Sequence, residues 1–375
     1  MSEPLIELPL LRSKERFHSL DTLRGLLMTL GIVLHTARVY DGSGSWRISD
    51  FKGDPAFTLI VHAIHLYRMP TFFVLSGFFS MLIFDSYGPR RFLAQRMRRL
   101  ILPFVTTLLT VNVMQEWFLA HFVHSSASNV GRAFSSSAGV SHLWFLVYLM
   151  LYVLAVWVLF GSHDWSRAAV AKLERVVNGD AFCLLRLYLV FIVAFASLRF
   201  VQRALGIGYI TFLGFIDSTD LIDYFLYYVG GLICFRSPSV FSAIKRLDPL
   251  GALLAAALGA LVLSDLRLSF GVSDAVYGIL RQSATFFGTS SLIGLFWQLF
   301  RKSSRVSRFF SDASYTIYLF HHILVIVFAW ALLTLTWSVV AKFFVVSTLC
   351  LATTACLHVL LISRVPLLRL FFNGK

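Results

Sequence analysis

Ten runs of apolar residues, each long enough to cross a bilayer as a helix, make up most of this sequence. In lipid, only α-helices and closed β-barrels satisfy every backbone hydrogen bond internally, and runs of this length are typical of helices. The runs cover residues 20–40, 57–84, 100–120, 141–160, 181–200, 219–235, 248–264, 278–300, 313–333 and 338–362. We therefore expect an all-α, polytopic integral membrane helix bundle of about ten transmembrane helices.

Basic residues gather in alternate segments between the runs, and this asymmetry predicts the orientation. Most of the 33 Lys and Arg residues lie in the two tails and in every second loop. Cytoplasmic loops of membrane proteins carry an excess of Lys and Arg, so we expect both termini in the cytoplasm. The chain then divides into a cytoplasmic tail (1–19), a transmembrane domain (20–363) and a second cytoplasmic tail (364–375).

The net charge of +14 does not indicate a nucleic-acid partner. The bases form short clusters between apolar runs, which favours contact with anionic membrane lipids over binding along one basic face. The four cysteines lie inside apolar runs, with no CxxC pair and no His/Cys spacing typical of a metal site. We therefore expect no metal ion and no bound cofactor.

The first run carries three polar groups that are costly in lipid: Asp21, Arg24 and His35. Arg24 and His35 are separated by three helical turns plus about 20°, so they share one helix face. An Arg in a spanning helix costs at least about 2.5 kcal/mol and normally faces protein or water. This predicts an intramembrane site where Arg24 and His35 line one cavity. The alternative is a snorkelling Arg and a packed core His.

The second run adds a deeper arginine. Arg68 is about eleven residues into its helix, close to the bilayer midplane, where a side chain cannot easily reach the headgroups. A guanidinium there suits an anionic group or a developing oxyanion. His65 lies one turn earlier on the same face, and Ser76 lies further along the helix. We predict a substrate contact for both, with packing near the outer surface as the alternative for His65.

Two shorter segments are predicted to meet the substrates. Arg98 and Arg99 end a basic cluster on the cytoplasmic side, which either enforces topology or attracts a phosphorylated donor such as coenzyme A. His142 and Trp144 open the fourth helix at the outer surface. An aromatic ring there suits either the interfacial belt or the face of a sugar.

The ninth helix carries a polar stripe. Tyr315, Tyr318 and His322 follow one another at helical spacing and share a face. His321 points about 100° away from His322, so we expect the two imidazoles to differ in role.

Imidazole and guanidinium groups inside a membrane allow more than one function. In acyl transfer, His35 would take the proton from an acceptor hydroxyl, while Arg24 and Arg68 hold the donor or polarise its carbonyl. In a transporter, the same charges would bind an anion and His35 would relay protons. A structural partner in an envelope assembly is the third class. Acyl transfer measured with the purified protein would separate the first class from the others.

Five short motifs follow one another along the chain. They are Arg24 followed after ten residues by His35, Tyr-Arg-Met-Pro-Thr-Phe-Phe-Val-Leu-Ser-Gly (67–77), Arg-Arg-Leu-Ile-Leu-Pro (98–103), His-Leu-Trp-Phe-Leu (142–146) and Ser-Tyr-Thr-Ile-Tyr-Leu-Phe-His-His (314–322). In this order they resemble the acyltransferase-3 family of integral membrane acyltransferases. The resemblance implies an O-acyltransferase whose arginine and histidine motif is Arg24 and His35, and whose second-helix arginine is Arg68.

Within that family, residues 17–24, the double histidine and the tail 364–375 resemble the branch that modifies osmoregulated periplasmic glucans. This implies succinyl transfer from cytoplasmic succinyl-CoA to hydroxyls of a periplasmic glucan, in a bacterial inner membrane beside a glucan-synthesising glucosyltransferase. The alternatives are an O-acetyltransferase of another envelope polysaccharide and a proton-coupled anion or glycan transporter. Because donor and acceptor lie on opposite sides, we expect a polar passage from Arg24 to His35.

Overall fold

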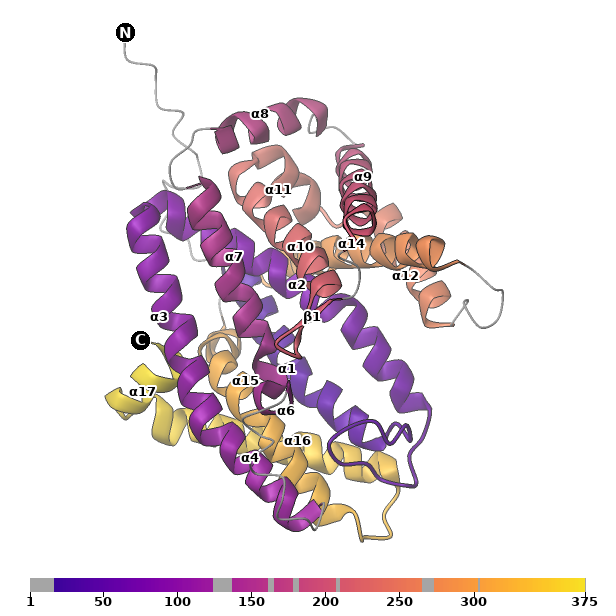
Figure 1. Ribbon diagram of the computed structural model, residues 1–375, viewed down its shortest axis with the longest axis vertical. Coiled ribbons are helices and arrows are strands. Elements are labelled where there is room, and N and C mark those ends of the chain that lie inside the picture. Colours follow the sequence, from indigo (N-terminus) through magenta and orange to yellow (C-terminus); the bar gives the residue numbers. More distant parts are fainter. Residues whose placement is uncertain are drawn as a thin grey trace.

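The computed structural model describes residues 17–123, 137–160, 165–177, 182–206, 210–264, 273–302 and 304–374, and the predicted N-terminal tail lies outside them up to residue 16. Its main helices are α1 (His18–Tyr40), α2 (Ala56–Tyr87), α3 (Pro89–Thr107), α7 (Trp144–Phe160), α9 (Cys183–Ala204), α10 (Ser218–Arg236), α12 (Pro249–Leu263), α14 (Asp274–Leu299), α15 (Arg305–Leu332) and α16 (Val339–Leu357). Each predicted run is helical where it is described, so the prediction of an all-α bundle is confirmed (Figure 1).

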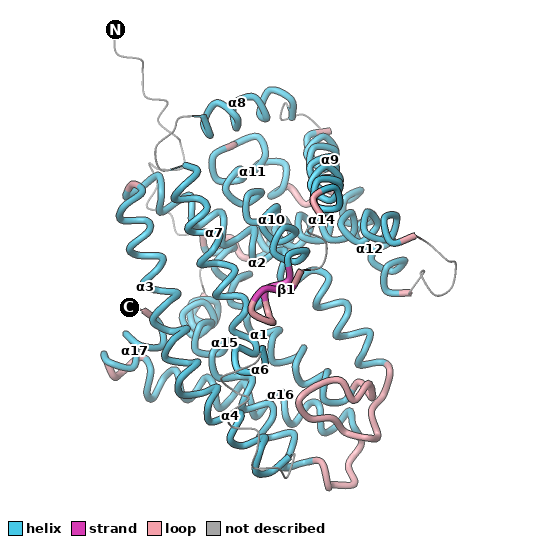
Figure 2. Tube along the Cα trace, in the orientation of Figure 1, coloured by secondary structure: helices cyan, strands magenta, loops and turns pink. Residues whose placement is uncertain are grey.

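Shorter elements connect and cover these helices. They are the turns η2 (Leu108–Asn112), η3 (Leu119–Val123), η5 (Ser141–Leu143) and η6 (His358–Ile362), and the helices α4 (Val113–Phe118), α6 (Ser137–Val140), α8 (Trp165–Val177), α11 (Pro238–Lys245) and α17 (Pro366–Asn373). In the described part of the chain, the only strands form the hairpin β1 (Thr211–Phe212) and β2 (Ile216–Asp217), drawn in magenta in Figure 2.

Within the described residues, six helices are long and apolar enough to cross a membrane, and the bent pair α11–α12 would make a seventh. Helices α1, α10 and α14 have the length, with 23, 19 and 26 residues, but they are less apolar than those six. A polar helix can remain inside a bundle when apolar neighbours cover it. These three are therefore the helices to examine for buried polar groups.

Helices α1 and α15 lie side by side and run in the same direction. Arg24 near the start of α1 contacts Ser311 near the start of α15, and Gly31 further along α1 faces His321. A Cβ on Gly25 would lie 2.9 Å from the carbonyl carbon of Phe310, so only glycine allows this approach. The close contact brings polar side chains of both helices onto one seam.

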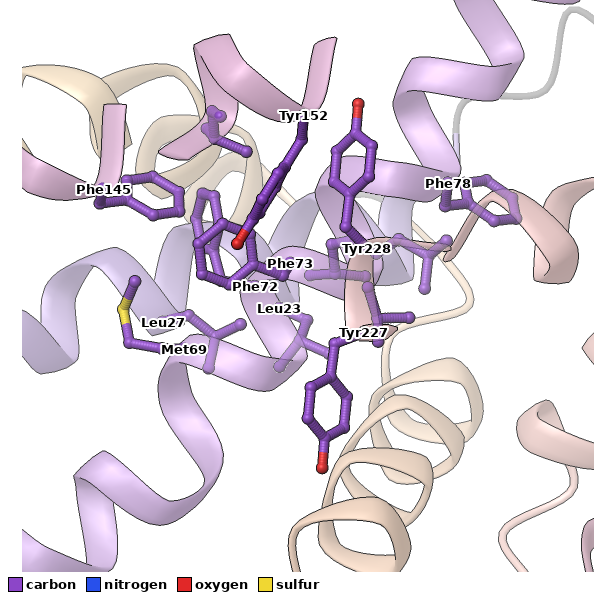
Figure 3. Close-up of a cluster of buried hydrophobic side chains, with 14 of the residues drawn as sticks. Leu23, Leu27, Met69, Phe72, Phe73, Phe78, Phe145, Tyr152, Tyr227 and Tyr228 are labelled. Carbon is purple, nitrogen blue, oxygen red and sulfur yellow. The ribbon is translucent and has the colours of Figure 1, made fainter. Parts of the chain in front are cut away.

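A second close pair, α2 and α10, supports the centre of the bundle. Gly77 of α2 and Gly231 of α10 lie directly against the backbone of the opposite helix, where a Cβ would overlap backbone atoms. Aromatic side chains fill the space around this pair and between α2 and α7, including Phe73, Phe145 and Tyr152 (Figure 3). This packing fixes α2, and with it the depth and direction of Arg68.

Candidate active site

Seven of the predicted site residues line one cavity between α1, α2, α7 and α15. The cavity has a volume of about 60 Å³. Its lining comprises His35, His65, Arg68, His142, Trp144, Tyr318 and His321, together with the apolar side chains of Met28, Leu34, Met69, Phe72 and Phe145. We call this the histidine cavity. It joins segments more than 280 residues apart in sequence, from α1 to α15.

Arg68 is held rigidly at one side of the histidine cavity. The residue is 8% exposed, and its Nε donates a hydrogen bond of 2.7 Å to the carbonyl oxygen of Leu27 in α1. Among the described residues that line the cavity, none is an Asp or Glu. A buried guanidinium beside a cavity without a carboxylate is arranged to accept a charge from outside the protein, such as an anionic ligand or a developing oxyanion.

Gly31 gives Arg68 and His321 the room to meet. A Cβ built on Gly31 would lie 2.7 Å from an Nη atom of Arg68 and 3.1 Å from Nε2 of His321. Both atoms therefore lie against the part of the α1 surface where Gly31 has no side chain. Any side chain at position 31 would push the guanidinium or the imidazole out of place.

His321 is fully buried and has a defined tautomer. Its Nδ1 lies 2.7 Å from the carbonyl oxygen of Tyr318 and 3.1 Å from that of Ile317, so Nδ1 must carry the hydrogen. Its Nε2 is buried without a hydrogen-bond partner. In the neutral ring this nitrogen holds a free lone pair, which can accept a proton from a group inside the cavity.

His322 belongs to a neighbouring layer of rings, as its different direction on the helix predicts. Its Nδ1 lies 2.7 Å from Oε1 of Gln115, and its ring stacks on His142 with centroids 4.9 Å apart. Both ring nitrogens of His142 are buried without a partner. Ser141, just before it, has a φ of 49°, in the left-handed region that costs a residue with a side chain about 1–3 kcal/mol. The backbone is therefore strained at the residue directly before His142.

His35 lies between these two layers. The centroid of its ring is 5.2 Å from that of His321 and 4.8 Å from that of His322. Its Nδ1 is buried without a partner. The indole of Trp46, from the loop between α1 and α2, stacks on the ring of His35 with centroids 5.6 Å apart. His35 is therefore the contact point between the histidine cavity and that loop.

Arg24 lies in a different cavity, so the prediction that it shares one with His35 is wrong. The Arg24 cavity has a volume of about 120 Å³ and is lined by His18, Asp21, Thr22, Arg24, Ser307, Arg308, Ser311 and Asp312. Arg24 pairs with Asp21 at 2.9 Å, and its side chain is 33% exposed. The apolar side chains of Leu27 and Met28 are buried on α1 between the two cavities. The two groups share a helix face, but packed side chains separate them.

The other predicted site residues lie outside the histidine cavity. Ser76 is partly buried on α2 and lines neither of the two cavities. Tyr315 donates a hydrogen bond of 2.9 Å to the backbone carbonyl of Arg99, which ties α15 to α3. The side chains of Arg98 and Arg99 are exposed on α3, where α17 packs against it. In this structure these four residues contribute to the surface and to helix packing.

His65 also borders a second, smaller cavity on the side of α10 and α14. Asp220, Asp223 and Arg281 line that cavity. Asp223 is already satisfied, because it accepts hydrogen bonds of 2.8 Å from both Arg199 and Gln282. Trp144, in turn, stacks on Tyr224 of α10 with centroids 5.9 Å apart. Aromatic and polar groups thus surround the cavity on this side.

Sequence reasoning missed three residues of the site: Gly31, Trp46 and Gln115. Gln115 and Glu116 are polar residues inside an apolar run, and that signal is visible in the sequence. Gln115 lies in α4 between the π-helical turns η2 and η3, and such turns are frequent at functional sites but cannot be read from the sequence. Nothing local marks Gly31 or Trp46, because their role comes from segments distant in sequence.

Among the described residues, no group of three or more His, Cys, Asp or Glu side chains is placed to hold a metal ion. The imidazoles of the cavity suit proton transfer, and its guanidinium suits charge stabilisation.

The fold and the site define a class: a polytopic helical membrane protein with a buried cluster of imidazoles beside a guanidinium. The acyltransferase-3 family model, described as an acyltransferase domain, matches residues 17–359. The chain belongs to this family and is a membrane acyltransferase. All five motifs that suggested the resemblance lie inside the matched range.

Two similar curated proteins carry the same name. Glucans biosynthesis protein C of Escherichia coli strain K12 is 26% identical to this chain over 387 residues, covering 96% of this chain and 95% of the relative. The protein of the same name from Escherichia coli O157:H7 (strain EC4115 / EHEC) is 26% identical over 385 residues with the same coverage. No solved structure significantly matches the chain.

Proposed function

We propose that this protein transfers a succinyl group from succinyl-CoA to hydroxyl groups of a periplasmic glucan. The observation that carries the proposal is the histidine cavity, which places four imidazoles beside a buried guanidinium. Among the described residues that line it there is no carboxylate. The name of the relatives supports a glucan as acceptor, since the likeness extends over nearly the full length of both chains.

His35 is the general base of the proposed reaction. It takes the proton from the acceptor hydroxyl as the hydroxyl oxygen attacks the carbonyl carbon of the thioester. The carbon–sulfur bond then breaks, and the proton passes from the imidazole to the departing thiolate. Arg68 stabilises the negative charge that develops on the carbonyl oxygen, because its position is already fixed by the bond to Leu27.

Arg24 acts at a distance from the reacting atoms. In the proposal, the Arg24 cavity receives a polar part of the donor, since it is open, polar and lined by Arg308 as well as Arg24. The acyl end must then pass the apolar residues Met28 and Met69 to reach His35. Methionine side chains are unbranched and flexible, so they can move aside to let the acyl group of the donor pass between the two cavities.

The proposed topology follows from the same division of roles. All ten long helices cross the bacterial inner membrane, with α1, α10 and α14 crossing as polar helices inside the bundle. Both termini, within 1–19 and 364–375, are cytoplasmic, and residues 20–363 form the transmembrane domain. The Arg24 cavity then faces the donor in the cytoplasm. The loop that carries Trp46 faces the periplasmic side, with the glucan acceptor, the membrane-lipid surface and a neighbouring glucosyltransferase.

Mass spectrometry of periplasmic glucans tests the proposal directly. Glucans from cells that contain the protein should carry an added succinyl mass, and glucans from cells without it should lack that mass. An added acetyl mass would replace succinyl with acetyl as the group transferred. Purified protein that moves an anion across vesicles, but forms no ester from succinyl-CoA and glucan, would favour the transporter and overturn the proposal.

A further inference from the structure

The loop between α1 and α2, residues 41–55, covers the histidine cluster with one side chain. The indole of Trp46 lies 5.6 Å from the ring of His35 in a stacked arrangement and 5.1 Å from the ring of His322 in an edge contact, measured between centroids. Trp46 is partly buried, while its neighbours Gly44 and Ser45 are exposed. The loop is the long pink segment at the lower right of Figure 2.

A buried ion pair holds this loop from a distant part of the chain. Nζ of Lys342 in α16 lies 2.7 Å from a carboxylate oxygen of Asp50, and the two side chains are only 1% and 6% exposed. The same Nζ donates a hydrogen bond of 3.2 Å to the carbonyl of Leu333. The backbone of Asp50 also donates to the carbonyl of Val39 at 2.9 Å. Asp50 therefore ties the loop both to the end of α1 and to α16.

The loop has a second attachment next to the histidine cluster. Arg47, which follows Trp46, pairs with Glu116 at 3.4 Å. Glu116 is the neighbour of Gln115, whose side chain lies against His322. Arg47 and Asp50 both follow Trp46 within four residues. Because both are held by other helices, they restrict where the indole can lie.

Stability alone does not explain the pair of Asp50 and Lys342. Taking two charges out of water is costly, and replacing a buried ion pair with apolar residues is often neutral or stabilising. A buried pair is better suited to fixing one geometry among several alternatives. The geometry that this pair fixes is the position of the loop over His35 and His322.

We propose that Trp46 determines specificity for a glucan hydroxyl over water, and that Asp50 and Lys342 are positioning residues for it. This inference rests on the proposed acyl transfer. A thioester beside an imidazole is also open to attack by water. Water adds to the carbonyl carbon, the carbon–sulfur bond breaks, and the proton released by water goes through the imidazole to the thiolate. The products are free succinate and coenzyme A, without a glucan ester.

The indole suppresses this side reaction by occupying the space from which water would reach His35. Excluding water from an active site prevents hydrolysis of reactive groups. An aromatic ring at the same place offers an apolar surface to a sugar ring, so the acceptor is not excluded with the water. The ratio of free succinate to glucan ester then measures how well the indole of Trp46 excludes water.

The experiment uses the purified full-length protein in lipid nanodiscs with succinyl-CoA and glucan, and measures free succinate and glucan ester separately. We expect Trp46→Ala to raise the ratio of succinate to ester about tenfold, and Trp46→Phe to keep it near the wild-type value. Asp50→Asn should raise the ratio in the same direction by a smaller factor, because the loop stays attached through Arg47.

The pair of Asp85 and Arg236 provides a matched control. It is joined at 2.6 Å, its side chains are 6% and 7% exposed, and it links α2 to α10 away from the histidine cavity. Asp85→Asn should cost stability as Asp50→Asn does, but leave the ratio unchanged. An equal rise in both variants would overturn the positioning role. If the wild type forms the glucan ester and Trp46→Ala leaves the ratio unchanged, Trp46 does not exclude water. The proposed acyl transfer would then still stand.

Discussion

The same two parallel helices, α1 and α15, build two cavities of opposite character. Near their first turns, the Arg24 cavity is polar and open, and Arg24 is partly exposed and paired with Asp21. Three turns further along, the histidine cavity is smaller, and Arg68 is buried beside imidazole nitrogens that have no partner. In both places an arginine and polar side chains meet, yet their surroundings differ.

The difference favours Arg68 over Arg24 as the group that stabilises developing charge in the proposed reaction. An exposed ion pair is screened by water and salt, so Arg24 can attract and hold a charged group but stabilises it weakly. A buried guanidinium acts through a lower dielectric and needs no reorganisation when charge develops nearby. We therefore assign binding to the Arg24 cavity and bond making to the histidine cavity, and each variant below tests that division.

Replacing the base should have the largest effect. His35→Gln keeps a polar side chain of similar length but cannot take up a proton, so we expect ester formation to fall by at least about 100-fold. The amount of folded protein in the membrane should stay close to the wild type, since Nδ1 of His35 is buried without a hydrogen-bond partner. Initial rates with succinyl-CoA and glucan measure the effect.

His321→Gln is the companion to that variant. His321 has the fixed tautomer that a base requires, with Nδ1 on the carbonyl of Tyr318 and Nε2 free. Should His321→Gln lose more activity than His35→Gln, the assignment of the base moves from α1 to α15. A loss of activity in either variant keeps the proposed reaction in the histidine cavity. Near-normal activity in both variants would show that the reaction takes place elsewhere.

A single methyl group at position 31 tests the geometry of the buried arginine. In Gly31→Ala, the new Cβ would lie 2.7 Å from an Nη atom of Arg68, which must then move. A displacement of about 1 Å near the reacting atoms can lower the rate roughly 100-fold, so we expect a loss between about 10- and 100-fold.

Gly230→Ala is the control, because a Cβ on that helical glycine meets nothing within 4 Å. Both changes gain about 1 kcal/mol of helix propensity, while the close contact at position 31 costs about 1–3 kcal/mol. Thermal stability is therefore measured beside activity, and rates are compared at a temperature where both variants are folded. Equal activity in the two variants would show that the placement of Arg68 is not critical.

The sequence predicted the helices well because their signal is local. Each apolar run fell on a helix of the described chain, although only six helices, or seven with the bent pair α11–α12, are long and apolar enough to span a membrane there. The cost of polar groups in lipid singled out His35, Arg68, His142 and His321, which line the histidine cavity. Helical periodicity also placed Arg24 and His35 on one face, correctly. What periodicity cannot show is whether packed side chains divide that face, and Met28 does so.

The parts that the sequence did not predict depend on contacts between distant segments. Trp46 has its role because Lys342, almost 300 residues later, holds Asp50. Gln115 reaches His322 because two π-helical turns flank α4. Tyr315 matched the polar stripe of α15, yet it faces the backbone of Arg99 and ties two helices together. Sequence spacing gives the face of a helix, whereas the neighbour on that face comes from the fold.

The exposed arginine should affect binding and leave chemistry nearly intact. We expect Arg24→Ala to raise KM for succinyl-CoA about 5- to 10-fold, with kcat within about twofold of the wild type, because the side chain is 33% exposed and lines a different cavity. Arg24→Lys should recover much of the affinity, since a point charge still attracts phosphate. A fall in kcat with unchanged KM would place Arg24 at the reacting atoms and remove the distinction between the cavities.

The smallest effect is expected at the edge of the histidine cavity. Gln115→Leu removes the acceptor for Nδ1 of His322, a hydrogen bond of 2.7 Å, and leaves the ring held by its contacts with His142 and His35. Losing a neutral hydrogen bond changes an equilibrium by about 1 kcal/mol, so we expect kcat to fall about three- to fivefold. Gln298→Leu, at an exposed glutamine bonded to the carbonyl of Arg246, should leave kcat unchanged. If Gln115→Leu instead matched the loss in His35→Gln, His322 would belong with the groups that move the proton, and the reacting centre would extend from the cavity into the layer of rings beneath Trp46.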